Sequence, residues 1–386
     1  MEESLNRFKN EKTVRLCTPS TRDFAKPNTK FILFADGETK YYLPKIEKNS
    51  DKKAIDQYDG KEVFIFDRLW PEPQRKFFTL TNVITDLSWH TNKICLIIPY
   101  FPFLRQDHDS SGTDPYETHE GKTALLSLRH LGMLGISRLI ILDGHCFKGE
   151  GIYTTDAAFR KFPKQQNKKT NIIEEIKEFE IISPNLKIIN LSMREELKRK
   201  VLFLAKQKGY KKILFISPDS GASYMGQRNL NKKRGTNEND GVVEVTEISS
   251  NIKKEELEEF DAICFVDDMV ASGGTNMDAI TYLRTEIGVK LLPFTNIFEN
   301  IPQKVVDLFC AVTHWQGLGD ASANLSSVGI SSKRLVVSNS IIHNNLPLVS
   351  GNAVRVQEKL EKAASLITFD DKKDVEEIRA FLKGPN

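Results

Sequence analysis

Short apolar runs alternate with amphipathic segments along most of this chain. The runs have the length of buried strands, and several end in a polar or glycine-containing turn, as parallel strands do. This alternation predicts an α/β protein with mainly parallel sheets. The strands are expected within residues 13–17, 62–66, 94–98, 138–142, 212–217, 262–266, 290–296, 309–314 and 334–338, and the helices at about 71–89, 122–135 and 194–208, with one or two more in 352–386.

Other parts of the chain lack this alternation. The turn signal Asp36-Gly37 stands between two strand-like runs and predicts a β-hairpin. Residues 108–121, 148–180 and 227–241 are polar and have no sustained apolar period, so we expect loops or insertions there. Residues 227–241 in particular are expected to be mobile.

The strand-and-loop pattern occurs twice, at residues 62–147 and again at 212–314, without clear sequence identity between the halves. A length of 386 residues also favours two domains over one. The predicted organisation is a first domain at 1–190, a second at 191–345 and a helical C-terminal tail at 346–386.

Composition and charge exclude several classes of protein. Hydrophobic residues make up 40% and charged residues 28% of the chain, which is ordinary for a globular protein, and the net charge of +3 does not favour a nucleic-acid surface. No apolar run approaches the 18 residues of a membrane span, and the N-terminus lacks the apolar core of a signal peptide. The five cysteines have no paired or metal-type spacing, so we expect reduced core cysteines in a cytoplasmic protein.

The most informative stretch is residues 262–276. Its apolar run ends in Asp267 and Asp268, a small-residue loop follows at 271–275, and a helix pattern begins after it. Ligands of parallel sheets bind at the carboxyl ends of strands, and the N–H groups of a helix start attract anions. Carboxylates repel phosphate but suit sugar hydroxyls or a divalent cation. The stretch therefore predicts a phosphorylated sugar as ligand, with a merely acidic, glycine-rich turn as the alternative.

The same stretch resembles the ribose-phosphate loop shared by type I phosphoribosyltransferases and phosphoribosyl pyrophosphate synthetases. The resemblance implies that Asp267 and Asp268 bind the ribose hydroxyls. It also implies that the loop residues hold the 5′-phosphate; these are Ala271, Ser272, Gly273, Gly274 and Thr275.

Five further stretches resemble the synthetases, in the family order. Residues 34–38 are similar to a segment that contacts ATP from a neighbouring subunit, and residues 98–107 to a segment that binds the nucleotide. The resemblance thus implies an ATP site formed by Phe34, Asp36, Glu38, Arg105, Gln106 and Asp107. It implies that His145 and Asp219 bind the metal ion and that Asp219 also faces ribose 5-phosphate. It further implies that Lys232 and Arg234 belong to a catalytic loop.

The resemblance implies two tandem type I phosphoribosyltransferase-like domains and a ribose-phosphate diphosphokinase. Such an enzyme binds ATP and ribose 5-phosphate, uses Mg²⁺, and forms a homo-oligomer; neither nucleic acid nor membrane is expected as a partner. Two other functions stay open, a phosphoribosyltransferase that consumes phosphoribosyl pyrophosphate and a non-catalytic regulatory subunit.

Structural roles are the alternative for several of these residues. His145 could be a core histidine, Arg105 a surface ion pair, residues 34–38 only a hairpin and residues 232–234 a solvated charge run. The chain also departs from the family pattern, because only thirteen steps separate Asp219 from Lys232, where the family has a helix and a strand. This shortened segment favours the regulatory alternative.

Overall fold

The chain forms two compact units, and its C-terminal part returns to the first. Unit 1 contains the described residues up to Leu191 and those from Val356 onward, and unit 2 contains Ser192–Arg355. The computed structural model describes residues 8, 10–22, 26–47, 51–106, 123–147, 149–154, 186–218, 223–236, 243–250, 252–291, 305–341 and 352–383.

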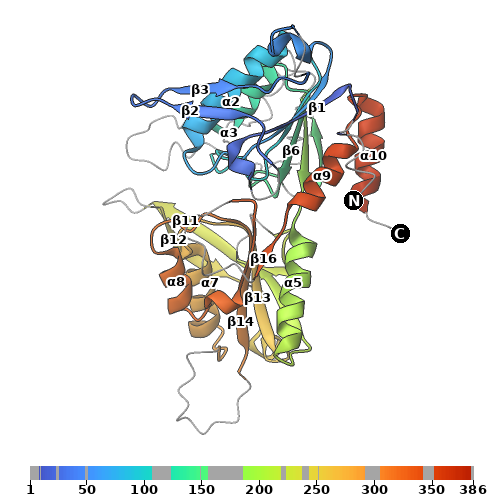
Figure 1. The fold of residues 1–386 in the computed structure, drawn as a ribbon. Helices are drawn as coiled ribbons and strands as arrows, with labels where there is room; N and C mark the ends of the chain where they lie inside the picture. The colour runs from blue at the N-terminus through green and yellow to red at the C-terminus, as the bar shows by residue number, and fades with distance from the viewer. Residues whose placement is uncertain are drawn as a thin grey trace, which may run out of the picture. The chain divides into compact units, whose positions relative to one another are not determined.

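Unit 1 is built on a six-stranded sheet of order β1-β4-β5-β6-β8-β7, in which only β7 is antiparallel (Figure 1). A separate antiparallel hairpin, β2–β3, lies beside it. The strands are β1 Thr13–Cys17, β2 Lys30–Leu33, β3 Thr39–Tyr42, β4 Glu62–Phe66, β5 Ile94–Ile97, β6 Arg138–Leu142, β7 Gly151–Thr154 and β8 Lys187–Leu191.

Helices cover both faces of this sheet, which explains why its central strands β5 and β6 are buried at every position and are apolar apart from Arg138. The helices are α2 Pro73–Ser88, α3 Thr123–Met133, α9 Gln357–Ser365 and α10 Asp371–Lys383. Alternate residues of β4 divide between the faces: Val63 and Ile65 pack with residues of α2 and α3, whereas the ring of Phe64 meets Phe369, 5.6 Å away between centroids.

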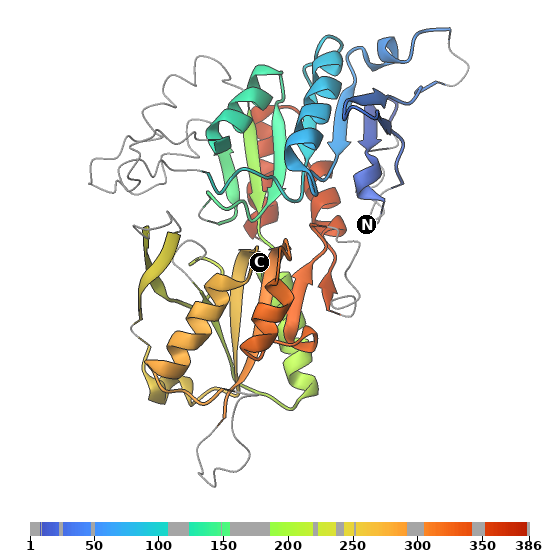
Figure 2. The ribbon, with the colours of Figure 1, turned by 90° about the vertical axis from the view of Figure 1, so that its left-hand side faces the viewer.

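Unit 2 repeats the arrangement with a six-stranded sheet of order β10-β9-β13-β14-β15-β16, parallel at every pairing. The hairpin β11–β12 is separate from it. Helices α7 and α8 pack on one face, and α5 contacts β13, β14 and β15 on the other (Figure 2). The elements are α5 Arg194–Gln207, β9 Ile213–Ser217, β10 Arg228–Asn229, β11 Asn231–Thr236, β12 Val243–Ser249, α6 Lys254–Leu257, β13 Ala262–Val270, α7 Gly274–Thr285, β14 Asp307–Trp315, α8 Ala321–Ser327, β15 Leu335–Ser338 and β16 Ala353–Val354.

The structure confirms the predicted fold class and the hairpin at Asp36-Gly37, and it corrects several local predictions. Strand β13 does not end at Val266 but continues to Val270, because β14 supplies backbone partners beyond the two acids. Part of the polar segment 227–241 forms β11, since β12 pairs with it. Strands β7, β8, β10, β12 and β16 were not predicted. Most of the predicted strand 290–296 lies outside the described residues, with a bridge at Leu291.

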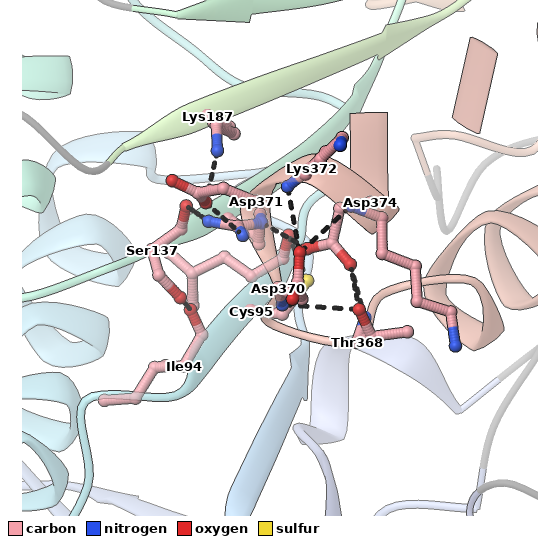
Figure 3. A network of polar contacts seen from close by, with 12 residues as sticks. Ile94, Cys95, Ser137, Lys187, Thr368, Asp370, Asp371, Lys372 and Asp374 are labelled. Carbon is pink, nitrogen blue, oxygen red and sulfur yellow. Dashed lines mark hydrogen bonds and ion pairs between the residues drawn. The ribbon is translucent and has the colours of Figure 1, made fainter. Parts of the chain in front are cut away.

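The helices predicted within 352–386 belong to unit 1, where an ionic network joins α10 to the sheet (Figure 3). Arg138, the first residue of β6, is buried and donates from Nε to Asp374, 2.8 Å away, and from Nη2 to Asp371, 2.7 Å away. The second oxygen of Asp374 accepts the N–H and the hydroxyl of Thr368, and Lys187 pairs with Asp371. These charges tie α10 to the amino end of β8 and to that of β6, which is more than 230 positions away in the chain.

The two cations of this network should differ in their contribution to stability. Arg138→Met leaves the carboxylate of Asp374 buried without its cation, so we expect the free energy of unfolding to fall by about 3–5 kcal/mol. Lys187→Met removes a partner only of Asp371, whose side chain is 63% exposed, and should cost at most about 1 kcal/mol. Chemical denaturation of both variants measures the difference, and equal losses would contradict the assignment.

Candidate functional site

The two acids of the ribose-phosphate motif lie at the carboxyl end of β13 in unit 2. Asp267 and Asp268 are buried, and the N–H of Asp268 donates to Asp267 Oδ1 over 3.0 Å. The thiol of Cys310 on β14 has a raised pKa, chiefly because of its burial and further because of the negative charge of Asp267. In the strand register Asp267 is opposite Val312 of β14.

The loop that follows β13 is held through its carbonyl groups. The carbonyl of Val270 accepts from the N–H of Gln316 and that of Ala271 from the N–H of Leu318, both over 2.9 Å. The carbonyl of Ser272 accepts the side-chain amide of Asn324 on α8 over 2.8 Å. Three successive carbonyls are thus occupied by the segment that follows β14.

Helix α7 begins directly after this loop. Gly273 has φ +82° and precedes the helix, where a side chain would be strained and would lie 3.4 Å from the carbonyl of Ala321. The first intrahelical bond runs from Met277 N–H to the carbonyl of Gly273, so the N–H groups before it precede the helical ladder. With no acidic residue in the first turn, this helix start can bind an anion such as a phosphate.

The predicted nucleotide segment of unit 1 follows β5. Tyr100, Phe101 and Leu104 are buried, and Phe77 of α2 contacts the rings of Phe101 and Phe103. These apolar anchors leave Arg105 and Gln106 exposed at the carboxyl end of the sheet.

His145 lies at the carboxyl end of β6, next to β5 in the sheet, and is half-buried. The residue before it, Gly144, has no room for a side chain: an added Cβ would lie 2.7–2.9 Å from Ile141, Phe147 and Leu104. Its N–H donates over 2.9 Å to Oδ1 of Asn190, a fully buried residue of β8.

Asn190 holds both ends of the histidine loop, because its Nδ2 donates over 2.8 Å to the carbonyl of Gly149. Asp143, just before Gly144, is fully buried and has φ +35°, a strained backbone for a residue that is not glycine. Sequence reasoning missed Asn190. A polar residue inside the apolar run 187–191 was the available signal for Asn190.

Sequence reasoning also missed a buried polar group at the carboxyl ends of β1 and β4. Asp67 Oδ1 accepts the hydroxyls of Thr18 and Ser20, and burial raises the pKa of Asp67 despite these hydrogen bonds. Lys76 of α2 donates to the carbonyl of Trp70 over 2.6 Å, and burial lowers the pKa of Lys76. These groups fix the loops beside the nucleotide segment.

The tip of the hairpin β2–β3 carries Phe34, Asp36 and Glu38, all exposed. The carboxylate of Asp36 accepts the N–H of Glu38 over 3.0 Å, and the N–H of Phe34 donates to the carbonyl of Glu38 over 2.8 Å. Asp36 therefore stabilises the turn, while the ring of Phe34 is 46% exposed.

Other predicted site residues are only partly placed. Asp107 and Asp219 lie outside the described residues. The backbone of Lys232 and Arg234 belongs to β11, which pairs with β12 and has a register irregularity between Lys233 and Arg234.

The structure thus distributes the predicted residues between two sheets. Arg105, Gln106 and His145 follow adjacent strands at the carboxyl edge of unit 1, and residues 267–275 lie at the carboxyl edge of unit 2. In the described part of the chain, no group of three or more His, Cys, Asp or Glu side chains is arranged to hold a metal ion. None of the helices placed by the structure combines the length and apolarity needed to cross a membrane.

Comparison with known proteins places this architecture in the class of doubled phosphoribosyltransferase-type folds. The crystal structure of phosphoribosylpyrophosphate synthetase from Mycobacterium smegmatis matches 97% of this chain and 99% of its own, with a TM-score of 0.55 and 16% sequence identity. The chain therefore has the synthetase fold, and the resemblance seen in its motifs is confirmed at the level of the fold.

The remaining comparisons add little to this. UMP synthase from Leishmania donovani is 11% identical over 84% of this chain and 71% of its own, with a TM-score of 0.18, at which the likeness carries no conclusion. The sequence matches no protein-family model and no curated protein.

The support of the histidine loop can be tested at Asn190. Asn190→Leu leaves the N–H of Gly144 buried without its acceptor and leaves the carbonyl of Gly149 with only the hydroxyl of Tyr153, so we expect a loss of about 2–3 kcal/mol in the free energy of unfolding. Ser137→Ala, which removes one side-chain bond to the carbonyl of Ile94 at the opposite sheet edge, should cost only about 1 kcal/mol. Amide hydrogen exchange should also accelerate at residues 143–147 in the Asn190 variant alone, and protection retained there would contradict the role of Asn190.

Proposed function

We propose that this protein is a ribose-phosphate diphosphokinase, which makes phosphoribosyl pyrophosphate and AMP from ATP and ribose 5-phosphate. The observation that carries the proposal is that each of two sheets bears one kind of motif at its carboxyl edge. Unit 1 bears the segments that resemble a nucleotide site, and unit 2 bears the acidic strand end and phosphate loop that resemble a ribose 5-phosphate site.

In this reaction the oxygen of the ribose 1-hydroxyl attacks the β-phosphorus of ATP. The bond from that phosphorus to the oxygen bridging the α-phosphorus breaks, AMP leaves with the bonding electrons, and the hydroxyl proton is released. Reactions of this type depend mainly on positioning and on neutralisation of charge.

Residues of unit 2 supply the positioning of the acceptor sugar in this proposal. The carboxylates of Asp267 and Asp268 accept hydrogen bonds from the ribose hydroxyls, and the start of α7 binds the 5′-phosphate. The occupied carbonyls of residues 270–272 favour this geometry, because they hold the loop through groups that a phosphate cannot use.

Residues of unit 1 bind the nucleotide in this proposal. Arg105 and Gln106 bind ATP, and Lys232 and Arg234 of unit 2 neutralise charge on the transferred group. The exposed ring of Phe34 suits a contact with the nucleotide of a neighbouring subunit in a homo-oligomer. His145 and Asp219 would hold Mg²⁺ together with the phosphates, and the ion would supply further neutralisation of charge; a carboxylate together with phosphate oxygens is a usual magnesium donor set.

The direct test is to incubate the purified protein with Mg²⁺, ATP and ribose 5-phosphate and to measure AMP and phosphoribosyl pyrophosphate. We expect the two products in equal amounts and none without ribose 5-phosphate. ATP binding without AMP formation would favour the regulatory subunit, to which the short segment before Lys232 points. Consumption of added phosphoribosyl pyrophosphate with a nucleobase would favour a phosphoribosyltransferase.

Two substitutions should separate binding from turnover. Asp268→Asn removes a charged acceptor, so the Kd for ribose 5-phosphate should rise about tenfold or more while that for ATP stays within about twofold. Asp261→Asn is the matched control at the amino end of β13, where the carboxylate accepts backbone N–H groups of residues 211 and 212, and it should leave both Kd values unchanged.

Lys232→Ala should chiefly lower kcat, because the lost charge would act on the transferred group. Lys233→Ala is its control, and an unchanged kcat in Lys232→Ala would remove Lys232 from the mechanism.

A further inference from the structure

A buried hydrogen-bonded group lies beside the ribose-phosphate loop and has no role in the proposal above. His314, near the carboxyl end of β14, is 2% exposed, and Thr313, Ser338 and Ser340 around it are equally buried. In the parallel register His314 is opposite Met269, the residue directly after Asp268. The group therefore lies one strand away from the acids.

The hydrogen bonds of this group determine which ring nitrogen carries the proton. Ser340 Oγ lies 2.8 Å from both the carbonyl of Thr313 and Nδ1 of His314. A carbonyl only accepts, so the single hydroxyl proton of Ser340 goes to Thr313, and His314 Nδ1–H must donate to Ser340. The loop after β15 thus orients the imidazole.

A short run of backbone connects His314 to the ribose-phosphate loop. Trp315 follows it and pairs with Val270 in the register. The next residues donate the two bonds described above, Gln316 N–H to the carbonyl of Val270 and Leu318 N–H to that of Ala271. The position of the end of β14 therefore decides whether these carbonyls are held.

We propose that His314 is a positioning residue for the ribose-phosphate loop. Its hydrogen bond to Ser340 holds the end of β14 in place. The backbone N–H groups of Gln316 and Leu318, which follow in the chain, then hold the carbonyls of Val270 and Ala271. As a result, the N–H groups at the start of α7 are arranged to bind a phosphate. The ligand named here rests on the proposed function, whereas the fixing of the loop does not. His314 itself need not touch the substrate.

Amide hydrogen exchange of the unliganded full-length protein tests the proposal without any activity. His314→Gln and Ser340→Ala remove the bond, and the amides of residues 271–277 should then exchange about tenfold faster. His314→Asn places an amide N–H near the position of Nδ1 and should restore exchange to within about twofold of the unmodified protein.

Tyr210→Phe is the control for general loss of stability. It removes the bond from the tyrosine hydroxyl to Asp307 Oδ2 at the amino end of β14, 3.0 Å long, and leaves the His314 group intact. Exchange at 271–277 that is unchanged in His314→Gln, or that is equally fast in Tyr210→Phe or His314→Asn, would overturn the positioning role.

Titration calorimetry with ribose 5-phosphate and with inorganic phosphate separates this proposal from the proposed function. We expect the Kd of both ligands to rise about tenfold in His314→Gln and to recover in His314→Asn, with the Kd for ATP unchanged. If the unmodified protein does not bind ribose 5-phosphate, the proposed function fails, and the exchange experiment alone still decides the role of His314.

Discussion

A parallel sheet covered by helices on both faces leaves only its two edges for polar chemistry, and this constraint organises the molecule. Strands β5 and β6 of unit 1 and β14 of unit 2 are buried at every position, so a charged side chain in their middle would have no solvent and no partner. Polar residues accordingly gather where the strands begin and end. Arg105, Gln106, His145 and residues 267–275 lie at carboxyl ends, where helix starts and loops supply N–H donors, whereas the candidates at 34–38 and 232–234 lie on the separate hairpins.

The amino ends of the strands carry ionic networks that stabilise each unit. In unit 1 Arg138 joins β6 to the C-terminal helix α10. In unit 2 Asp307 begins β14 and binds Lys208 and Arg334, which outweigh the effect of burial and lower the pKa of Asp307. The ionic networks that stabilise each sheet and the candidate ligand residues of that sheet therefore lie at opposite strand ends. A substitution at one end can be compared with a control substitution at the other end.

The candidate sites also depend on neutral buried polar groups at the carboxyl edge. Asn190 satisfies two backbone groups of the His145 loop, and the hydroxyl of Ser340 joins His314 to Thr313. Such groups are costly to bury without partners, and once satisfied they permit few alternative arrangements. Loops that bear exposed ligand groups thus gain a defined shape from side chains that no ligand contacts.

The sequence by itself determined the fold class, most of the parallel strands and the stretch at residues 262–276, because apolar runs of strand length and glycine turns are local signals. Pairing was decided only by the tertiary structure: β13 runs past Asp268 because β14 lies beside it, and the polar segment with Lys232 is a strand because β12 is its partner. The C-terminal helices join unit 1 through Arg138 and Asp374, which are 236 positions apart, and no local pattern encodes such a contact. Asn190 and His314 were missed for the same reason: the role of a single polar residue in an apolar strand depends on its hydrogen-bond partners, and only the fold brings those partners next to it.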